Sequence, residues 1–317
     1  MQYGLGAIPS PHDRRDYSVA SFSPIVTLGD YMPPDILKTK NQGAVGACVA
    51  YGLEHQAAVH YLMEHGHERR FDPNYVYGYR GAEDYQGEGM IVREALQMQR
   101  RNGISDEGQL LWPYAVFYAG LKNQQQYYTP EVHANAMYQR IESYYSAQTE
   151  AEIDTALLKG PVGFVIPIYS SFINPPANGI LPMPNPSLES MHGAHYVVAV
   201  GKRGRYWVIQ HWWGDWGDQS MLGYCMGYLP IGYPMYEAWG TIDEPLPPKQ
   251  QTNITLILNN PLATVNGKQV YIDPANHSIT PTVADGRTRV PLRFVAESFG
   301  AEVGYDDRTK TVTIKGR

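Results

Sequence analysis

The sequence predicts an α+β fold in which a helical lobe precedes a β lobe, and a small α+β domain follows at the C-terminal end. Helical spacing of apolar residues dominates up to about residue 160, and runs of β-branched and aromatic residues dominate from there to about residue 230. A proline-rich stretch then separates the final segment from the rest. This order suits a two-lobed domain with its site between the lobes. The predicted helices are Cys48–His65, Gly89–Asn102 and Glu150–Lys159, and the predicted strands are Val162–Tyr169, 195–201, 205–211 and 223–228.

Composition excludes several classes of function. The chain has 317 residues, of which 43% are hydrophobic and 18% charged, as in soluble globular proteins. A net charge of −6 lacks the positive excess that nucleic acid binding requires. No apolar run approaches the roughly 20 residues that span a bilayer, so we expect no membrane span. The N-terminal residues carry no signal-peptide pattern.

A single cysteine stands where the first apolar helix begins. The run 40–50, Lys-Asn-Gln-Gly-Ala-Val-Gly-Ala-Cys-Val-Ala, delivers Cys48 to the first helical turn, where free backbone amides favour a thiolate. Gln42 lies six residues upstream, so its amide could reach an oxyanion beside the sulfur. We therefore predict that Cys48 is an activated nucleophile. Cys225, which has no charged neighbour in the sequence, is predicted to be a buried core residue.

Two histidines occupy the two strands of a predicted hairpin. If the hairpin is centred on Arg203, His195 lies directly opposite His211, and directly opposed residues have Cβ atoms roughly 5 Å apart. A one-residue bulge would shift this register. The pairing predicts a base, His195, and an orienting partner, His211. An ordinary histidine titrates near about pH 6.5, so we expect protonation of His211 to limit activity on the acidic side.

These motifs resemble those of papain-like cysteine peptidases. In that family the catalytic histidine follows the cysteine by roughly 130–150 residues, and His195 follows Cys48 by 147. The family then has Asn-Ser-Trp-Gly, where this chain has His-Trp-Trp-Gly at 211–214, so the usual asparagine is missing. The resemblance implies a papain-like two-lobe fold and cysteine endopeptidase activity on peptide or protein substrates, with no cofactor or metal. It implies an oxyanion role for Gln42, and it implies that Trp213 shields the contact between His195 and residue 211.

The resemblance also suggests where substrate lies. Residues 87–90, Gly-Glu-Gly-Met, match the region where the family runs the substrate backbone along a glycine pair. Gly89 and Met90 occupy that place and are, with Trp213, the predicted substrate-binding residues. A side chain at Met90 would narrow the pocket for the second residue before the cut. The alternative is an ordinary loop.

Four histidines lie on the first helix and its exit: His55, His60, His65 and His67. Spacings of five and ten residues do not place three imidazoles on one helical face. We therefore expect a solvated helix surface and no metal site.

The chain divides by composition into a leader at 1–30, a peptidase domain at 31–243, a linker at 244–251 and a C-terminal domain at 252–317. The leader resembles the short leader of bacterial papain-like proteins and is too short to be the helical inhibitory pro-region of the eukaryotic enzymes. Two alternatives remain for it: it wraps the peptidase domain, or it blocks the cleft until cut.

The last segment has its own pattern. Asn266-Gly267 signals a hairpin, and the run 289–297, Arg-Val-Pro-Leu-Arg-Phe-Val-Ala-Glu, resembles the copper amine oxidase N-terminal domain. That module carries no copper ligand set despite its name. The resemblance implies a stalk or attachment role at a cell wall or cell surface, and hence a secreted or surface-attached bacterial protein.

Two other functions fit the same residues. A catalytically weak or inactive adhesion or scaffold protein would explain the missing asparagine, although Cys48, Gln42 and His195 are retained. Acyl transfer without hydrolysis, as in a transferase or amidase, would use the same dyad.

Overall fold

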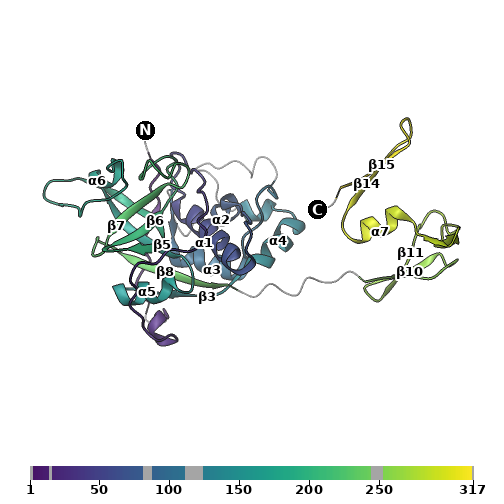
Figure 1. Ribbon diagram of the computed structural model, residues 1–317, viewed down its shortest axis with the longest axis horizontal. Coiled ribbons are helices and arrows are strands. Elements are labelled where there is room, and N and C mark those ends of the chain that lie inside the picture. The colour runs from purple at the N-terminus through teal and green to yellow at the C-terminus, as the bar shows by residue number, and fades with distance from the viewer. Residues whose placement is uncertain (1–2, 14–15, 81–87, 111–123, 244–252, 316–317) are drawn as a thin grey trace. The chain divides into compact units, whose positions relative to one another are not determined.

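The computed structural model describes residues 3–13, 16–80, 88–110, 124–243 and 253–315. Its contacts divide the chain into two compact units, Met1–Leu246 and Pro247–Arg317 (Figure 1). The predicted linker at 244–251 lies outside the described residues. None of the described helices is both long and apolar enough to cross a membrane.

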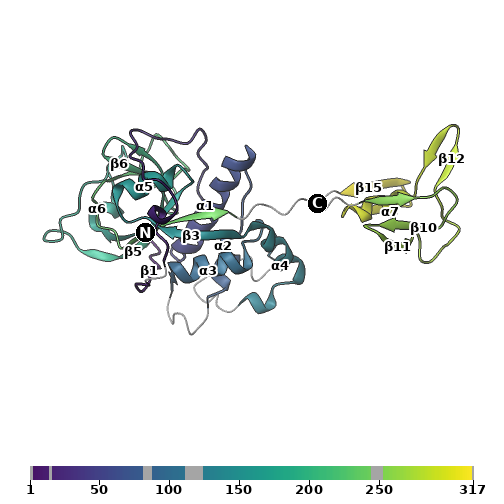
Figure 2. The same cartoon turned by 90° about the horizontal axis from the view of Figure 1, so that it is seen from below.

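The first unit begins with a helical lobe built around α1, Cys48–His65. This helix has the predicted bounds and ends at Gly66, whose φ of 70° is the left-handed conformation that commonly closes helices. The rest of the lobe consists of α2 (Pro73–Gly78), α3 (Val92–Asn102), α4 (Pro130–Ala136) and two 3₁₀ turns, Gln124–Tyr127 and Met137–Gln139. Figure 2 shows α2, α3 and α4 grouped beside α1.

The β lobe is a six-stranded sheet in the order β3-β8-β4-β5-β6-β7, and its neighbouring strands are antiparallel. Its strands are β3 (Ile141–Ser146), β4 (Val162–Tyr169), β5 (Met191–Arg203), β6 (Tyr206–Gln210), β7 (Met226–Pro230) and β8 (Glu237–Asp243). Two short helices accompany it, α5 (Glu150–Leu157) and α6 (Ser170–Ile173).

Strand β5 separates the two larger hydrophobic cores of this unit. Alternate side chains of a strand point to opposite faces of the sheet. Val198 and Val200 therefore join the core built on α1, and Val197 and Ala199 join the core that contains α5. The result is a two-lobe α+β arrangement with β5 in contact with both sides, as the sequence predicted.

The predicted register of the histidine hairpin is wrong. Arg203 is not the centre of the turn but pairs with Tyr206, so the turn is formed by Gly204 and Arg205. A bulge between Ala199 and Gly201 shifts the register once more. His211 consequently lies just beyond the end of β6 and is not paired with His195 in the β5–β6 ladder. On the other side of β5, His195 pairs with Ile166 of β4.

Predicted element ends differ by a few residues. Helix α3 begins at Val92 rather than Gly89, because Gly89 has a φ of 108° and Met90–Ile91 form the short strand β2. Helix α5 ends at Leu157. The strand predicted at 223–228 begins at Met226, since Gly223 and Cys225 both have positive φ values.

The N-terminal residues pack on both lobes of the first unit. β1 (Ala7–Ile8) pairs in parallel with β2, and a 3₁₀ turn spans Val19–Ser21. Farther along, the backbone of Leu28 donates to Asp154, a buried carboxylate that also accepts from Lys202 at 2.8 Å.

The second unit is small and contains three separate sheets. β9 (Ile254–Leu256), β10 (Leu262–Val265) and β11 (Lys268–Tyr271) form one; β12 (Thr282–Ala284) pairs with β13 (Arg287–Arg289), and β14 (Glu302–Asp306) with β15 (Thr311–Lys315). One helix, α7, spans Leu292–Ser298. The predicted Asn266-Gly267 turn is confirmed, since Val265 pairs with Lys268 and both turn residues have positive φ values.

Candidate active site

Cys48 begins helix α1 in the interior of the first unit, with no exposed surface. Backbone amides of Tyr196, Gly6, Val49 and Cys48 itself act on the sulfur to lower the thiol pKa, but burial outweighs them and raises the pKa to about 11. In this covered arrangement burial favours the thiol over the predicted thiolate.

Cys225 also lies in the core, with no exposed surface and a pKa raised to about 12 by burial. The prediction that Cys225 is a buried core residue is confirmed.

His195 lies on β5, directly before the residue whose amide contacts the Cys48 sulfur. Its Nε2 lies 3.3 Å from Nδ1 of His211. Its Nδ1 has no hydrogen-bond partner among the described residues. Burial lowers the pKa of His195 to about 3, so the ring is neutral here. One ring nitrogen is thus held by His211, and the other remains available to exchange a proton.

His211 is enclosed by aromatic rings. Ring centroids of Trp216, Trp213 and Phe172 lie 4.1, 4.8 and 5.5 Å from that of His211. Burial, with a smaller effect of His195, lowers the pKa of His211 well below its ordinary value. This direction opposes the expected titration of His211 near pH 6.5.

Trp213 covers the histidine pair. Its ring centroid lies 4.5 Å from that of His195, and Trp213 is only 5% exposed. The indole lies where the resemblance to the peptidase family places a shield against water.

Gln42 is held in a loop attached to the β lobe, because its backbone N–H donates to the carbonyl of Trp212 at 2.9 Å. Its side-chain Nε2 donates to two carbonyls, those of Val45 at 2.6 Å and Gly4 at 3.1 Å. The amide that the sequence predicts as an oxyanion donor therefore already binds a carbonyl of the N-terminal segment.

The N-terminal segment lies across these residues, as one of the two alternatives for the leader predicts. Tyr3 stacks on Trp213, with ring centroids 4.4 Å apart and planes 10° from parallel. The Gly4 carbonyl also accepts from Trp213 Nε1 at 3.4 Å, and the Gly6 amide contacts the Cys48 sulfur.

Gly89 and Met90 contact the same segment. The backbone N–H of Met90 donates to the Gly6 carbonyl at 2.9 Å. A Cβ on Gly89 would lie 2.5 Å from that carbonyl oxygen, so close approach requires glycine there. Gly87, the first glycine of the predicted motif, lies outside the described residues.

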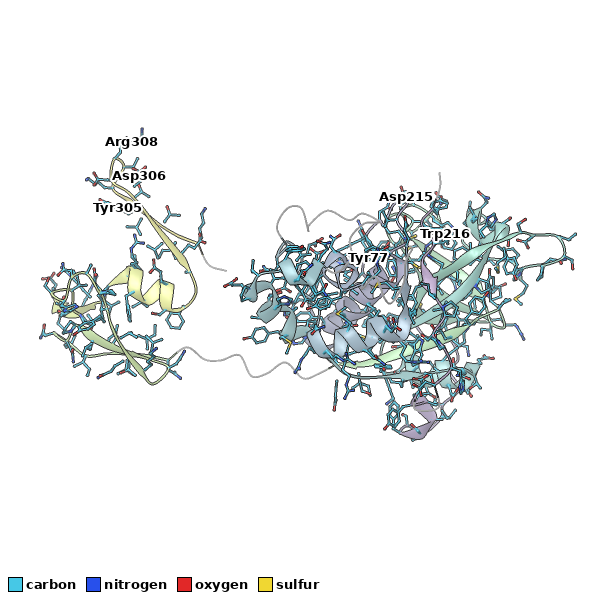
Figure 3. The ribbon with its side chains drawn as sticks, turned by 180° about the vertical axis from the view of Figure 1, so that it is seen from behind. Tyr77, Asp215, Trp216, Tyr305, Asp306 and Arg308 are labelled. Carbon is cyan, nitrogen blue, oxygen red and sulfur yellow. The ribbon has the colours of Figure 1, made fainter. Side chains whose placement is uncertain are left out.

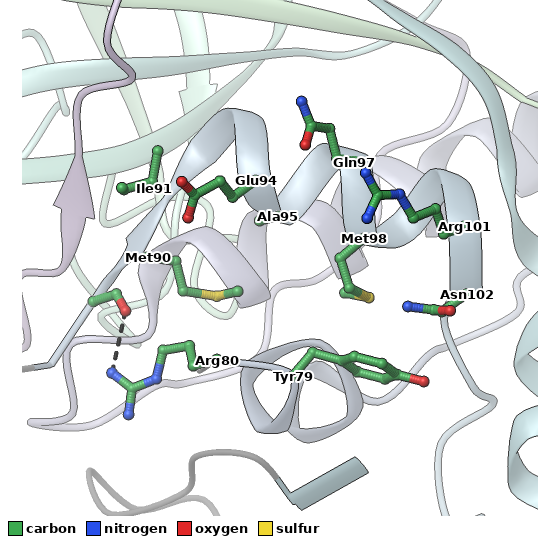
Figure 4. A pocket seen from close by; sticks show the side chains of 11 residues that line it. Tyr79, Arg80, Met90, Ile91, Glu94, Ala95, Gln97, Met98, Arg101 and Asn102 are labelled. Carbon is green, nitrogen blue, oxygen red and sulfur yellow. Dashed lines mark hydrogen bonds between the residues drawn. The ribbon is translucent and has the colours of Figure 1, made fainter. Parts of the chain in front are cut away.

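A pocket of about 370 Å³ lies behind Gly89 and Met90 (Figure 4). Its wall includes Arg80, whose Nη1 donates to the Gly89 carbonyl at 3.1 Å. On the neighbouring α2, the buried Tyr77 accepts from the Gly89 amide at 3.3 Å; Figure 3 labels it among the helices of this lobe. Sequence reasoning missed both residues, because no local pattern links 77–80 to residue 89.

The histidines of α1 are not all solvated as predicted. His55 is fully buried and lies 3.1 Å from Gln210, and His60 is 5% exposed and lies 3.0 Å from Thr241. His65 and His67 are exposed. Within the described residues, no group of three histidine, cysteine or acidic side chains is placed to hold a metal ion.

Comparison with protein families matches residues 30–228 to the papain family cysteine protease model and residues 246–315 to the copper amine oxidase N-terminal domain. None of the curated proteins matches the chain significantly.

Solved structures show the same fold for the first unit. Xylellain, a cysteine protease from Xylella fastidiosa, superposes with a TM-score of 0.57 at 20% identity, covering 76% of this chain and 96% of its own. Digestive procathepsin L 3 of Tenebrio molitor gives 0.54 at 18% identity, covering 74% and 75%. The ragweed pollen allergen Amb a 11, a cysteine protease in its proform, gives 0.53 at 15% identity, covering 72% and 70%.

Proposed function

The chain belongs to the papain family of cysteine proteases, and from that premise we propose that it is an endopeptidase in which Cys48 and His195 cleave peptide bonds. One observation carries the proposal: His195 contacts His211 through Nε2, and the next residue, Tyr196, directs its backbone amide at the Cys48 sulfur. This arrangement holds one imidazole nitrogen and leaves the other for the thiol.

The reaction follows from these positions. Nδ1 of His195 accepts the Cys48 thiol proton, and the thiolate sulfur bonds to the scissile carbonyl carbon. The carbonyl oxygen becomes an oxyanion that accepts from Gln42 Nε2 and the Cys48 backbone amide. The amide C–N bond then breaks as His195 returns the proton to the leaving amine. Water, activated by His195, hydrolyses the thioester and restores the thiol.

His211 acts in the place of the usual asparagine. When His195 is protonated, its Nε2–H needs an acceptor, and a neutral His211 offers Nδ1. A protonated His211 has only donors and would repel the imidazolium. The aromatic enclosure, which keeps the His211 pKa well below its usual value, supports this role.

Substrate would lie along Gly89 and Met90, where a backbone amide already binds a carbonyl. The Met90 side chain is buried and lines the pocket of Figure 4. Met90 stands where the family has the second glycine of its pair. We propose that Met90 narrows the subsite for the second residue before the cut. Trp213 would border the opposite side of the scissile bond.

One experiment distinguishes the peptidase from the two alternative functions, an adhesion or scaffold protein and an acyl transferase or amidase. Mass spectrometry after treatment with an epoxide inhibitor of papain-like enzymes, together with cleavage of a small peptide, tests the nucleophile and the reaction. Modification of Cys48 with peptide hydrolysis supports the peptidase. Absence of both in a form with an open cleft favours an adhesion or scaffold protein, and product transfer to an added amine without hydrolysis favours acyl transfer.

We further propose that the C-terminal unit attaches the peptidase to a cell wall or cell surface outside the cell. Support comes from its match to a domain outside the peptidase family and from its separation from the peptidase unit. Fractionation of cells that express the full chain and the chain without residues 247–317 tests this, and equal release of both forms would contradict it.

A further inference from the structure

We propose that Cys225 is a positioning residue of the peptidase: its carbonyl and its sulfur hold the backbone of residues 211–216 and so fix the His211 ring that orients His195. This role rests on the peptidase function proposed above, and it concerns a residue that lies outside the dyad and outside the proposed substrate contacts.

Only one nitrogen of the His211 ring is held by a hydrogen bond to the part of the chain that the structure describes. Its Nδ1 lies 3.3 Å from Nε2 of His195, whereas its own Nε2 has no partner among the described residues. A functional imidazole is usually oriented by the hydrogen bond that its second nitrogen makes. His211 also lies beyond the end of β6, outside the strand ladder. The direction of its ring is therefore set by its own backbone and by the packing around it.

Cys225 supplies the anchor for that backbone. The backbone N–H of His211 donates to the Cys225 carbonyl at 3.2 Å, and the backbone N–H of Trp213 donates to the Cys225 sulfur at 3.3 Å. The amides of Trp213, His211 and Trp216 all act on this sulfur. Trp216, which Figure 3 labels, is the ring closest to His211, with centroids 4.1 Å apart. One residue thus contacts the loop at the orienting histidine, at the tryptophan that covers His195 and at the tryptophan that packs on His211.

The backbone of Cys225 is strained. Its φ of 44° lies in the left-handed region, which residues with a side chain rarely occupy. Glycine would adopt this φ without strain, but glycine has no sulfur to accept from Trp213. In this conformation the carbonyl and the sulfur of Cys225 both accept from the same loop. Strain of this kind persists only where the surrounding structure holds it, and it is typical of functional sites.

The Cys225 thiol acts as a neutral acceptor. It has no exposed surface, and burial raises its pKa to about 12 in spite of the amides around it. The thiol is therefore protonated at neutral and acidic pH. An alanine at this position would leave the buried amide of Trp213 without its acceptor, and an unpaired buried donor carries the full cost of its desolvation. The loop would then have to shift until that amide meets another partner.

A shift of this loop reaches the reacting groups. His211 contacts Nε2 of His195, and the Trp213 indole lies 4.5 Å from the same ring. The loop also holds Gln42, whose backbone N–H donates to the Trp212 carbonyl at 2.9 Å. The proposed contacts to the substrate backbone, in contrast, lie on β2 beside the helical lobe. Loss of the anchor should therefore lower kcat much more than it raises KM.

The first test compares Cys225→Ala, which removes the side-chain acceptor, with Cys225→Ser, which keeps one. The control is Val162→Ala, because Val162 is fully buried in the same hydrophobic core but lies at the start of β4. A misplacement of about 1 Å costs up to about 10²-fold in rate. We expect kcat on a small peptide to fall at least about tenfold in Cys225→Ala and to stay within about threefold of the native value in Cys225→Ser and Val162→Ala, with KM changed less than about threefold in all of them.

An unchanged kcat in Cys225→Ala would overturn the positioning role, and so would an equal fall in Cys225→Ala and Val162→Ala. If Cys225→Ala does not fold, Cys225→Gly takes its place, because glycine adopts the positive φ without strain and also lacks the acceptor. The same fall in kcat is expected for it.

A double-mutant cycle tests whether Cys225 acts through His211. If Cys225 only supported the fold, Cys225→Ala would lower kcat by the same factor whether or not residue 211 is a histidine. In the proposed role the effect depends on the ring that Cys225 positions. We therefore expect Cys225→Ala to lower kcat by less than about twofold in the His211→Ala background. A fall of about tenfold in both backgrounds would overturn the positioning role.

Amide hydrogen exchange measures the anchor without requiring peptidase activity. Mass spectrometry follows the exchange of residues 211–216 in the native chain, Cys225→Ala, Cys225→Ser and Val162→Ala. We expect faster exchange of this segment in Cys225→Ala and exchange at the native rate in the other two variants. Faster exchange in Cys225→Ala, with no peptide cleavage by any form, the native chain included, would keep the anchor and overturn the peptidase. Exchange at the native rate in Cys225→Ala would overturn the anchor.

Discussion

Nε2 of His195 and Nδ1 of His211 lie 3.3 Å apart, on rings that are nearly perpendicular and have no exposed surface. The two histidines are 16 positions apart and belong to β5 and to the residue after β6. A second imidazole can therefore orient the first, provided that it carries no charge.

The first prediction concerns pH. Phe172, Trp213 and Trp216 bury His211 and so hold its pKa well below its usual value. His211 thus stays neutral as pH falls through 6, and the acid limb of the native enzyme should superimpose on that of His211→Asn. The measurement is kcat/KM against pH for the native chain and His211→Asn. An acid limb that moves to lower pH in His211→Asn would show that His211 titrates.

A second variant, His211→Ala, tests whether His211 orients the His195 ring, independently of whether His211 carries a charge. His211→Ala removes the acceptor for His195, so kcat should fall by about 10²- to 10⁴-fold at every pH, while KM changes little. His211→Asn should restore most of that activity. If His211→Ala keeps the native kcat, the pair has no positioning role.

The second prediction uses the buried histidines of α1. Burial lowers the pKa of His60 to about 4, below its unfolded value of about 6.5. The unfolded chain therefore binds a proton in this window that the folded chain does not, and stability is lost as pH falls from 6.5 toward 4. The slope from one such group approaches about 1.4 kcal/mol per pH unit.

Urea unfolding of native chain and His60→Gln at pH 7, 6 and 5 measures this difference. The native free energy of unfolding should decline more steeply than that of His60→Gln. Exposed His67 provides the control, because His67→Gln should leave the slope unchanged. Parallel declines in the native and His60→Gln chains would show that His60 is not held neutral by burial.

The third prediction concerns a buried ion pair. Lys202 is 4% exposed and Asp154 is fully buried, and their charged atoms lie 2.8 Å apart. Asp154→Ala would leave the ammonium group without its buried partner and remove the acceptor of the Leu28 amide. We expect a loss of about 3–5 kcal/mol in the free energy of unfolding.

The matched control is Glu68→Ala, which breaks an ion pair with Arg70 whose acidic partner is 54% exposed. That change should cost less than about 1 kcal/mol. The measurement is urea unfolding of the two variants under identical conditions. Similar losses in both would mean that the Lys202–Asp154 pair contributes no more than a surface pair.

The sequence predicted the elements that carry the dyad and missed the contact that covers it. Helix α1 and strand β4 have their predicted bounds, because helix start signals and β-branched runs are local. The hairpin register was wrong because a bulge at Ala199–Gly201 leaves no local signal. His195 and His211 are nevertheless in contact. The observed register differs from the predicted one by only a short shift along the strand, which leaves His211 within reach of His195.

Features that depend on distant segments could not be predicted. Burial raises the pKa of Cys48 although the helix start lowers it, and the amides that act on its sulfur include those of Gly6 and Tyr196, which are distant in the sequence. The sequence predicted solvated side chains for His55 and His60, because their spacing fits no metal site. Both are buried, since α1 is surrounded by the sheet and by other helices. Gly4 and Gly6 are the local signal that the N-terminal backbone passes close to another segment. The sequence alone does not show that this segment is the loop at Val45–Gly46.

The last prediction concerns the independence of the C-terminal unit. The contacts divide the chain near residue 246, and the three sheets of residues 253–315 use no strand from the first unit. Removal of residues 247–317 should therefore leave kcat/KM within about twofold of its value with the unit present, because none of the described site residues lies beyond 225. Peptide hydrolysis and the midpoint of urea unfolding of the first unit are measured in both forms. A large loss of activity or a lower midpoint on removal would show that the peptidase unit depends on the C-terminal unit for its fold.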